Sequence, residues 1–365
     1  MQKFLTLFSH IIFISNSIMQ DRLDERIPLS ETAYSRTDFV SDQMVKWCPG
    51  CGNYGVLHAV TQVLPRLGYR KENYVMVSGI GCSSRFPYYV NTYGFHGIHG
   101  RAAAIASGMK IANPALSVWV STGDGDSMAI GGNHFIHAIR RNIDMTILLY
   151  NNQIYGLTKG QFSPTTPMGA VTKTSPYGTL EAPFKPAELV IGAQGTFFAR
   201  VVDNNMKMMT DAFEEAARHK GTAVVEVLQN CVIYADKTHG MITGKEYRDD
   251  NQVFLKHGEP ILFGKDNTKG IRLNRCRLEV VEIGKNGATI DDILVHDRYE
   301  TDPIIQMMLA KMTPPAFPMA LGVIRSAEQK SFDRMVEEQI NANKNQSSIR
   351  CVDDMLNSGD VFEIK

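Results

Sequence analysis

The sequence places an aspartate between two glycines at the end of one apolar stretch and a pair of asparagines at the end of the next. The first group is Gly123-Asp124-Gly125, after "LSVWVST", and the second is Asn151-Asn152, after "DMTILLY". A diphosphate can be held by backbone N–H groups, a helix N-terminus and a divalent cation. Mg²⁺ prefers hard oxygen ligands, commonly one or two carboxylates together with phosphate oxygens. The pattern therefore indicates a magnesium diphosphate site.

Each residue type has a role in such a site. Asp124 supplies a carboxylate, Asn152 a neutral amide oxygen, and Ile154 a backbone carbonyl as a third protein oxygen. Gly125 lets the backbone turn tightly and approach the phosphate, and the N–H of Asp126 begins the next helix. A Gly-Asp-Gly sequence alone is more often a surface turn. The helical pattern, apolar strand and paired asparagines that follow favour the binding site.

Four cysteines have positions that suit a metal or redox centre. Cys48 and Cys51 form a CxxC pair, and Cys82 and Cys231 each follow a different predicted strand. A CxxC pair occurs in zinc sites, redox pairs and iron–sulfur sites. Because the carboxyl ends of parallel strands share one edge of a sheet, four thiolates can meet beside the diphosphate. This favours an iron–sulfur cluster, with zinc and a redox pair as alternatives.

The elements that must position these residues alternate along the chain. Nearly all-apolar strands separated by helical patterns predict an α/β fold, a parallel sheet with helices on both faces. Such sheets bind ligands beyond the carboxyl ends of their strands. Strands are predicted at residues 73–81, 116–125, 144–152 and 221–230. A turn followed by a helix is predicted within residues 47–68, and further helices at 99–114, 127–142 and 207–219.

The domain plan follows from where this pattern begins and ends. We expect an N-terminal extension over residues 1–41, one cofactor-binding domain over 42–240, and a C-terminal tail over 241–365 that packs on the domain or on a partner. Residues 1–18 are apolar but too short for a membrane span, and Met19 is an alternative start. The Gly- and Pro-rich segment at 156–186 is long for a loop, which favours a functional or partner-contacting role.

The composition excludes several classes of protein. The 365 residues are 44% hydrophobic and 21% charged, and Lys plus Arg equals Asp plus Glu at 38 each. This balance supports neither a nucleic-acid-binding surface nor an acidic tail, and we expect neither a nucleic-acid nor a membrane partner. Six cysteines are too few for a disulfide scaffold of this length. We therefore expect a cytoplasmic globular protein in a reducing compartment.

With these motifs in place, the sequence from residue 42 to 234 closely resembles the beta subunit of 2-oxoacid:ferredoxin oxidoreductases. The resemblance rests on "WCPGCGNYGVLHA", "GIGCSSRFPYY", "FHGIHGRA", "TGDGDSMAIGGNHFIHAIRRN" and "NNQIYGLTKGQFSPT". It implies a thiamine diphosphate-binding fold, Mg²⁺ bound by Asp124, Asn152 and Ile154, and one [4Fe–4S] cluster on Cys48, Cys51, Cys82 and Cys231. It also implies that thiamine diphosphate is contacted by Ile80, Gly81, Cys82, Ser83, His99, Gly125, Asp126, Gly156 and Leu157.

The resemblance implies an activity and a partner. Such enzymes decarboxylate a 2-oxoacid on thiamine diphosphate, pass single electrons through the cluster to ferredoxin, and transfer the acyl group to coenzyme A. The carboxylate that activates the aminopyrimidine ring belongs to a separate alpha subunit, and the sequence offers no second cofactor domain for it. We therefore expect an αβ or α2β2 enzyme, inactive as an isolated beta chain.

The choice of 2-oxoacid is predicted from the substrate end of the site. Residues at the positions of Arg85 and Leu157 line this end in the family, and an arginine can bind the second carboxylate of 2-oxoglutarate. Arg85, His99, Leu157 and Lys159 are thus the candidate catalytic residues, although Arg85 could instead pair with a protein carboxylate and Lys159 could simply be solvated. Pyruvate or broad-range 2-oxoacid oxidation, a non-oxidative thiamine enzyme and a zinc-stabilised scaffold remain alternatives.

Overall fold

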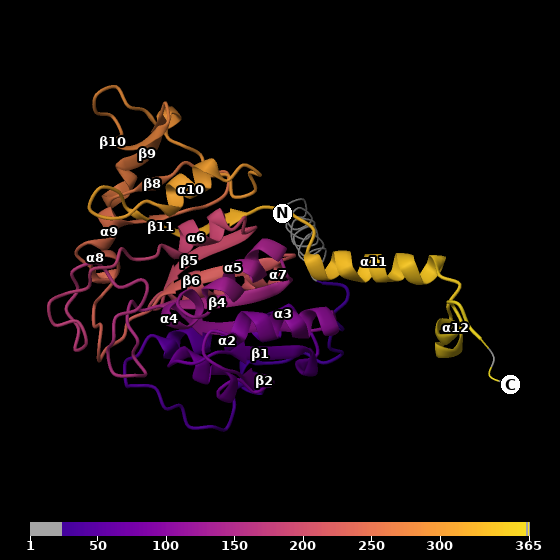
Figure 1. Cartoon of the computed structure of the whole chain (residues 1–365). Helices are drawn as coiled ribbons and strands as arrows, with labels where there is room; N and C mark the ends of the chain where they lie inside the picture. The colour runs from indigo at the N-terminus through magenta and orange to yellow at the C-terminus, as the bar shows by residue number, and fades with distance from the viewer. Residues whose placement is uncertain (1–23, 363, 365) are drawn as a thin grey trace, which may run out of the picture.

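An eight-stranded, mostly parallel sheet forms the centre of the computed structural model, which describes residues 24–362 and residue 364 (Figure 1). The expectations for residues 1–18 lie outside this range. From one edge to the other, the strands are β2 (Tyr93–His96), β1 (Tyr74–Ser78), β3 (Ser117–Gly123), β4 (Met145–Asn151), β6 (Thr222–Leu228), β5 (Phe197–Val202), β11 (Met319–Ser326) and β7 (Gln252–Phe254). The strands from β2 to β5 run parallel, and β11 is antiparallel to β5.

Helices cover both faces of this sheet, as the strand composition predicts. All residues of β1, β4 and β6 are buried. Their side chains alternate between two hydrophobic cores, so that Leu148 faces one helical layer while Ile147 and Leu149 face the other. The first layer contains α2 (Asn53–Leu67) and α7 (Met206–Arg218); the second contains α3 (Ala102–Ala112), α5 (Gly132–Arg141), α6 (Pro186–Gly192) and α10 (Ile304–Ala310). The predicted α/β fold is confirmed.

The predicted helix over 127–142 is two helices, α4 (Asp124–Met128) and α5, separated at residues 129–131. The break follows from close backbone packing against the loop that precedes α3. A Cβ atom on Gly131 would lie 2.4 Å from the carbonyl oxygen of Asp126, and one on Gly100 would lie 2.6 Å from the nitrogen of Gly131. Glycine at both positions lets two loops at the carboxyl edge of the sheet touch.

The region beyond residue 240 extends the central sheet through β11 and β7 and adds a small antiparallel sheet (Figure 1). The small sheet consists of β8 (Leu262–Phe263), β9 (Lys269–Asn274) and β10 (Arg277–Glu282). The short helices are α8 (Gly240–Thr243), α9 (Arg248–Asn251) and the 3-10 segments Arg36–Phe39, Lys71–Asn73, Ser83–Tyr88, Lys265–Asn267 and Ile290–Asp292.

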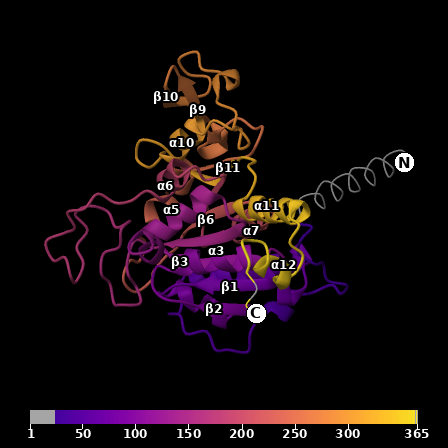
Figure 2. The same cartoon turned by 45° about the vertical axis from the view of Figure 1, so that its right-hand side comes forward.

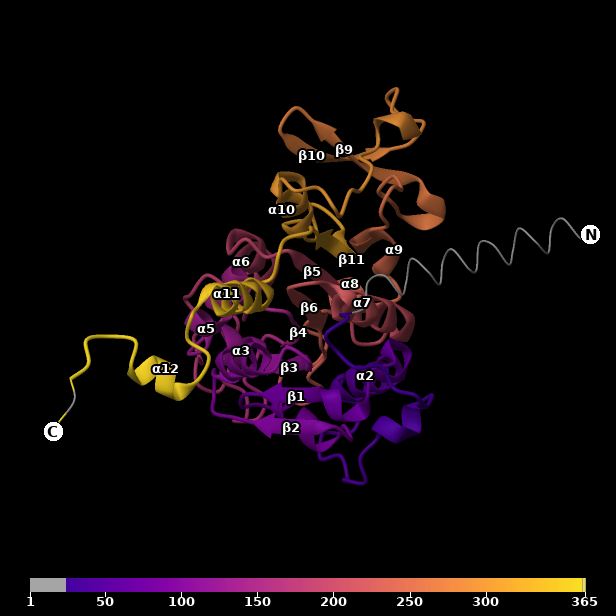
Figure 3. The ribbon, with the colours of Figure 1, turned by 90° about the vertical axis from the view of Figure 1, so that its right-hand side faces the viewer.

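Two helices at the C-terminal end, α11 (Phe332–Gln346) and α12 (Val352–Leu356), lead away from the sheet in Figure 1. They lie in front of the sheet in the view of Figure 2, and α12 lies to one side of it in Figure 3. Apart from the first turn of α11, their side chains are largely exposed. None of the helices within the described residues is long and apolar enough to cross a membrane.

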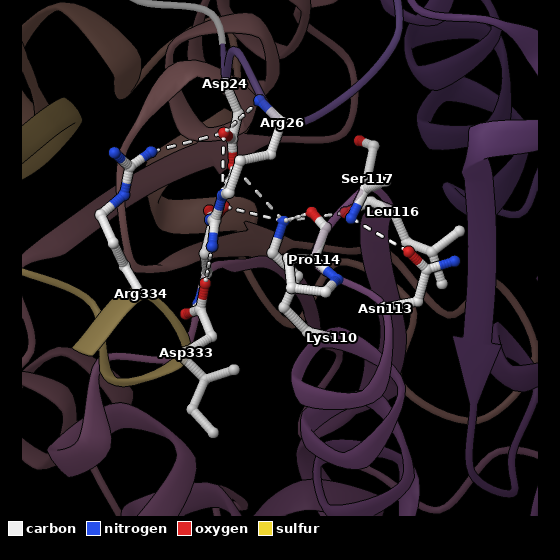
Figure 4. A network of polar contacts seen from close by, with 12 residues as sticks. Asp24, Arg26, Lys110, Asn113, Pro114, Leu116, Ser117, Asp333 and Arg334 are labelled. Carbon is white, nitrogen blue, oxygen red and sulfur yellow. Dashed lines mark hydrogen bonds and ion pairs between the residues drawn. The ribbon is translucent and has the colours of Figure 1, made fainter. Parts of the chain in front are cut away.

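A buried network of charges joins the first described residues to α3, β4 and the start of α11 (Figure 4). The Arg26 guanidinium lies 2.8 Å from the carboxylate of Asp24 and 2.9 Å from that of Asp333. Lys110, only 1% exposed, lies 2.9 Å from Asp144. Burial disfavours the ionised form of Asp24, but hydrogen bonds from Arg26 and the charge of Lys110 lower its pKa overall. The network therefore fixes the first described residues and the start of α11 on the domain.

We predict that Arg26→Ala destabilises the fold, because it leaves buried carboxylates without their cation. The expected loss is about 3–5 kcal/mol in the free energy of unfolding, measured by urea denaturation. Lys207→Ala is the control, since its partner Asp211 lies 2.6 Å away on an exposed surface; its expected cost is below about 1 kcal/mol. Equal effects of the two substitutions would contradict a structural role for the buried network.

Candidate active site

A cavity of about 580 Å³ lies at the carboxyl edge of the sheet. The ends of β1, β3, β4 and β6 meet there with the first residue of α2 and the loop after β4. Among its lining residues are the cofactor and magnesium residues predicted from the sequence: Ile80, Gly81, Cys82, Ser83, His99, Asp124, Gly125, Asp126, Asn152, Ile154, Gly156 and Leu157.

Asp124 is buried in the wall of this cavity, with 2% of its surface exposed. One carboxylate oxygen accepts hydrogen bonds from the hydroxyls of Ser163 at 2.6 Å and Thr165 at 2.5 Å. Burial raises the pKa of Asp124 to about 6, although these two hydroxyls act in the opposite direction. A carboxylate in this environment lacks a nearby positive charge, and a divalent cation would supply one.

Asn152 and Ile154 follow β4 and face the same cavity. The Asn152 side-chain oxygen accepts a hydrogen bond from the backbone N–H of Ile154 at 3.2 Å. The Asn152 amide nitrogen donates to the side-chain oxygen of Gln229 at 2.8 Å. These contacts hold the amide in one orientation, with its oxygen available for a hard cation.

The side chain of Asp126 organises the loops around the cavity. One of its oxygens accepts hydrogen bonds from the backbone N–H groups of Ile80 at 3.0 Å and Gly100 at 2.7 Å and from Nδ1 of His99 at 2.8 Å. The other accepts from the Thr122 hydroxyl at 2.7 Å. Because Nδ1 of His99 faces a carboxylate, it carries the hydrogen. The ring of His99 is thereby held on the cavity wall.

Residue 125 must be a glycine because the ring of Tyr155 packs directly against it. A Cβ atom at this position would lie 2.2 Å from the ring of Tyr155, whose hydroxyl donates to the Gly125 carbonyl at 3.0 Å. The Tyr155 ring also packs edge-on against His99, with ring centroids 6.1 Å apart. Tyr155 therefore joins the loop after β4 to the turn that carries Asp124.

The four cysteines of interest are free and come from three segments at this edge. Gly156 lies between two of them, because a Cβ atom there would be 3.5 Å from Sγ of Cys231 and 3.7 Å from Sγ of Cys82. The pKa of the Cys51 thiol is raised to about 12, mainly by burial, with smaller contributions from the neighbouring Cys82, Cys231 and Cys48. Within the described residues, no three His, Cys, Asp or Glu side chains form a ready metal-binding group.

Comparison with known proteins identifies the chain. Residues 79–227 match the family model described as thiamine pyrophosphate enzyme, C-terminal TPP binding domain. The chain is 44% identical, over 93% of its length and 91% of the relative's, to 2-oxoglutarate oxidoreductase subunit KorB of Mycobacterium tuberculosis. It is 44% identical to 2-oxoacid:ferredoxin oxidoreductase subunit beta of Saccharolobus solfataricus, over 56% of this chain and 66% of that protein. The chain belongs to the family of 2-oxoacid:ferredoxin oxidoreductase beta subunits.

A solved structure extends this similarity to three dimensions. The 2-oxoglutarate:ferredoxin oxidoreductase from Magnetococcus marinus, determined with 2-oxoglutarate, coenzyme A and succinyl-CoA bound, matches with a TM-score of 0.72 and 28% identity. The match covers 92% of this chain and 99% of that chain. The chain is thus a subunit of a thiamine diphosphate-dependent oxidoreductase, as the sequence motifs predict.

Two candidate catalytic residues of this beta subunit lie outside the cavity lining. Arg85 is partly buried in the 3-10 segment after Cys82, and within the described chain it forms no ion pair with a carboxylate. Lys159 is exposed in the turn after Gly156 and has a left-handed backbone conformation, with φ of 78°. Both remain predictions, as do the roles of His99 and Leu157.

Several residues in or next to the cavity are not predicted from the sequence. Ser163 and Thr165, from the long loop at 156–186, provide the hydroxyls on Asp124. Gln229 and Asn53 line the cavity with almost fully buried side chains. The long loop carried a signal through its Gly- and Pro-rich composition, but neither Gln229 nor Asn53 belongs to a recognisable spacing. Contacts between distant segments select them.

We predict that Asp124→Asn stabilises the cofactor-free protein at neutral pH. The raised folded-state pKa means that protonated Asp124 stabilises the fold below about pH 4, and that this contribution is lost as the pH rises through about 6. The asparagine variant should therefore exceed the wild type by up to about 3 kcal/mol at pH 8 and by much less at pH 4. Thermal and urea unfolding at both pH values, without Mg²⁺ or thiamine diphosphate, measure the difference. A difference independent of pH would contradict the prediction.

Proposed function

We propose that this chain is the beta subunit of an enzyme that oxidises 2-oxoglutarate with coenzyme A and ferredoxin, forming succinyl-CoA and CO2. The observation that supports this most strongly is the single cavity in which Asp124 and Asn152 lie beside Cys82. A cation site and a potential cluster ligand thus line one space. A thiamine enzyme without electron transfer has no use for the second feature.

In this proposal, Mg²⁺ is bound by the Asp124 carboxylate, the Asn152 amide oxygen and the Ile154 carbonyl. The donor set suits the cation, since all three ligands are hard oxygens. The buried, raised-pKa carboxylate of Asp124 gains the positive charge that its surroundings lack. When bound, thiamine diphosphate supplies the electron sink for decarboxylation, and the protein fixes its diphosphate at the N-terminal turn of α4.

Cys48, Cys51, Cys82 and Cys231 are the proposed ligands of one [4Fe–4S] cluster. Burial raises the pKa values of the Cys51 and Cys82 thiols, so their thiolates require a partner such as iron that neutralises the negative charge. Gly156 lies close to the sulfur atoms of both Cys82 and Cys231, which brings these two proposed ligands to the same residue. The cluster would therefore adjoin the cavity in which the acid reacts, which suits single-electron transfer out of the site.

An alpha subunit is proposed to complete the active site. Among the described residues that line the cavity, the only carboxylates are Asp124 and Asp126. The first binds two hydroxyls and the second four donors. Neither is available to activate an aminopyrimidine ring, so that carboxylate must come from another chain. An αβ or α2β2 assembly follows.

The decisive experiment uses the chain co-purified anaerobically with its alpha partner. About four iron and four sulfide per beta chain, together with viologen reduction that depends on coenzyme A and is faster with 2-oxoglutarate than with pyruvate, would support the proposal. Zinc in place of iron would overturn the redox function. Faster turnover of pyruvate would keep the reaction and overturn the substrate.

We predict that Arg85→Ala raises the KM for 2-oxoglutarate by about 10-fold or more, because one charge-assisted hydrogen bond to the second carboxylate is lost. The KM for pyruvate, which lacks that carboxylate, should change little. Arg85→Lys keeps the charge and should have an intermediate effect. Arg70→Ala, an exposed arginine bonded to the Leu29 carbonyl, is the matched control. Equal losses for both acids would exclude this role of Arg85.

A further inference from the structure

One buried side chain joins the proposed magnesium site to the proposed cluster site. Gln229 follows β6 directly, lies two residues before Cys231, and is 1% exposed. It also lines the cavity. Its side-chain oxygen accepts from Asn152 at 2.8 Å, while its side-chain nitrogen lies 3.4 Å from Sγ of Cys51. Gln229 thus contacts one proposed ligand of each centre.

The orientation of the Gln229 amide is determined by its backbone neighbour. The Gln229 nitrogen donates to the carbonyl oxygen of Asn230, an atom that can only accept. The reversed amide would place two oxygen atoms against each other. The Gln229 oxygen must therefore face the Asn152 side chain.

The orientation of the Gln229 amide determines that of the Asn152 amide at the proposed magnesium site. An oxygen of Gln229 requires a donor from Asn152, so the Asn152 nitrogen points toward Gln229 and the Asn152 oxygen points away from it. The backbone N–H of Ile154, which bonds that oxygen, independently requires the same arrangement. Without Gln229, the Asn152 amide would lose one of the two contacts that present its oxygen.

The same orientation places an N–H group on Cys51. Sulfur hydrogen bonds are longer than those to oxygen, and N–H donors to ligand sulfurs help set the potential of an iron–sulfur cluster. The backbone N–H of Asn53 also bonds the Cys51 sulfur and favours its thiolate. Of these two donors to Cys51, Gln229 contributes a side chain and Asn53 a backbone N–H. The contact of Gln229 can therefore be removed by substitution without changing the backbone.

We propose that Gln229 is a positioning residue that couples the two centres, orienting Asn152 toward Mg²⁺ and raising the reduction potential of the cluster through Cys51. The inference rests on the proposed function, because it assumes that both centres are present. It predicts that one substitution changes both cofactor affinity and cluster potential, which a purely structural role would not require.

The test uses Gln229→Met in the enzyme co-purified with its alpha subunit, since methionine keeps the length of the side chain but makes neither contact. The Kd of thiamine diphosphate with Mg²⁺ should rise about 10-fold or more, as expected for a residue that orients a metal ligand. The midpoint potential of the cluster, followed by electron paramagnetic resonance during redox titration, should fall. An unchanged value of either quantity would overturn the coupling.

Two further variants keep the result interpretable. Gln229→Leu is a second variant that makes neither contact, and it should show the same rise in Kd and the same fall in midpoint potential; a wild-type value of either quantity would overturn the coupling. Gln252→Met is the matched control, because Gln252 on β7 bonds the Ile242 carbonyl and lines no part of the cavity; its Kd and potential should equal those of wild type.

Failure of this inference is distinguishable from failure of the proposed function. Wild-type enzyme with iron, sulfide and thiamine diphosphate, together with a Gln229→Met variant of unchanged affinity and potential, would overturn the role of Gln229 alone. Wild-type enzyme without iron would overturn the proposed function, and the coupling with it.

Discussion

The arrangement of the cavity depends on one buried carboxylate, that of Asp126. It accepts hydrogen bonds from four donors on three segments: Ile80 after β1, His99 and Gly100 in the loop before α3, and Thr122 near the end of β3. A buried charge without such donors would be costly, so the loops must approach closely enough to provide them. Gly79 makes this approach possible, because a Cβ atom there would lie 2.1 Å from a carboxylate oxygen of Asp126.

Asp124 and Asp126 are two residues apart and equally buried, yet their surroundings suit different roles. Asp126 has donors on both oxygens, two of them backbone N–H groups, and is satisfied within the chain. Asp124 has two hydroxyls on one oxygen, and its pKa is raised to about 6 by burial. The first carboxylate therefore stabilises the loops, while the second retains an unmet preference for positive charge. The different hydrogen-bond donors around the two carboxylates, rather than their positions in the sequence, explain why Asp126 suits a structural role and Asp124 suits cation binding.

The sequence predicts the strands that lead into the site, because each is a continuous apolar run followed by glycine, cysteine, aspartate or asparagine. It does not predict β5, which contains Arg200 within its buried run. The charge is compensated by Glu226 on β6, 2.6 Å away, and this pairing exists only once the sheet has formed. The same limit applies at the site. Asp124 and Asn152 carry local signals, whereas Ser163 and Gln229 are selected by contacts across the fold. Strand β2 and the short strands β7 and β8 lack an extended apolar pattern. Strand β11, "MALGVIRS", is mostly apolar, but no distinctive polar residue follows it.

The fold buries side chains that must be ionised to bind a metal, although burial disfavours their ionised forms. Burial raises the pKa of Asp124 and of the Cys51 and Cys82 thiols, so each of these groups resists the ionised form that a metal requires. The fold nevertheless holds two of them through specific contacts: Asp124 accepts from the hydroxyls of Ser163 and Thr165, and Cys51 accepts from the amide of Gln229. Binding of a cation or an iron cluster would remove this conflict, and free energy released at the site would then stabilise the fold. Metal affinity and folding stability are therefore expected to be linked in this subunit through the same few buried groups.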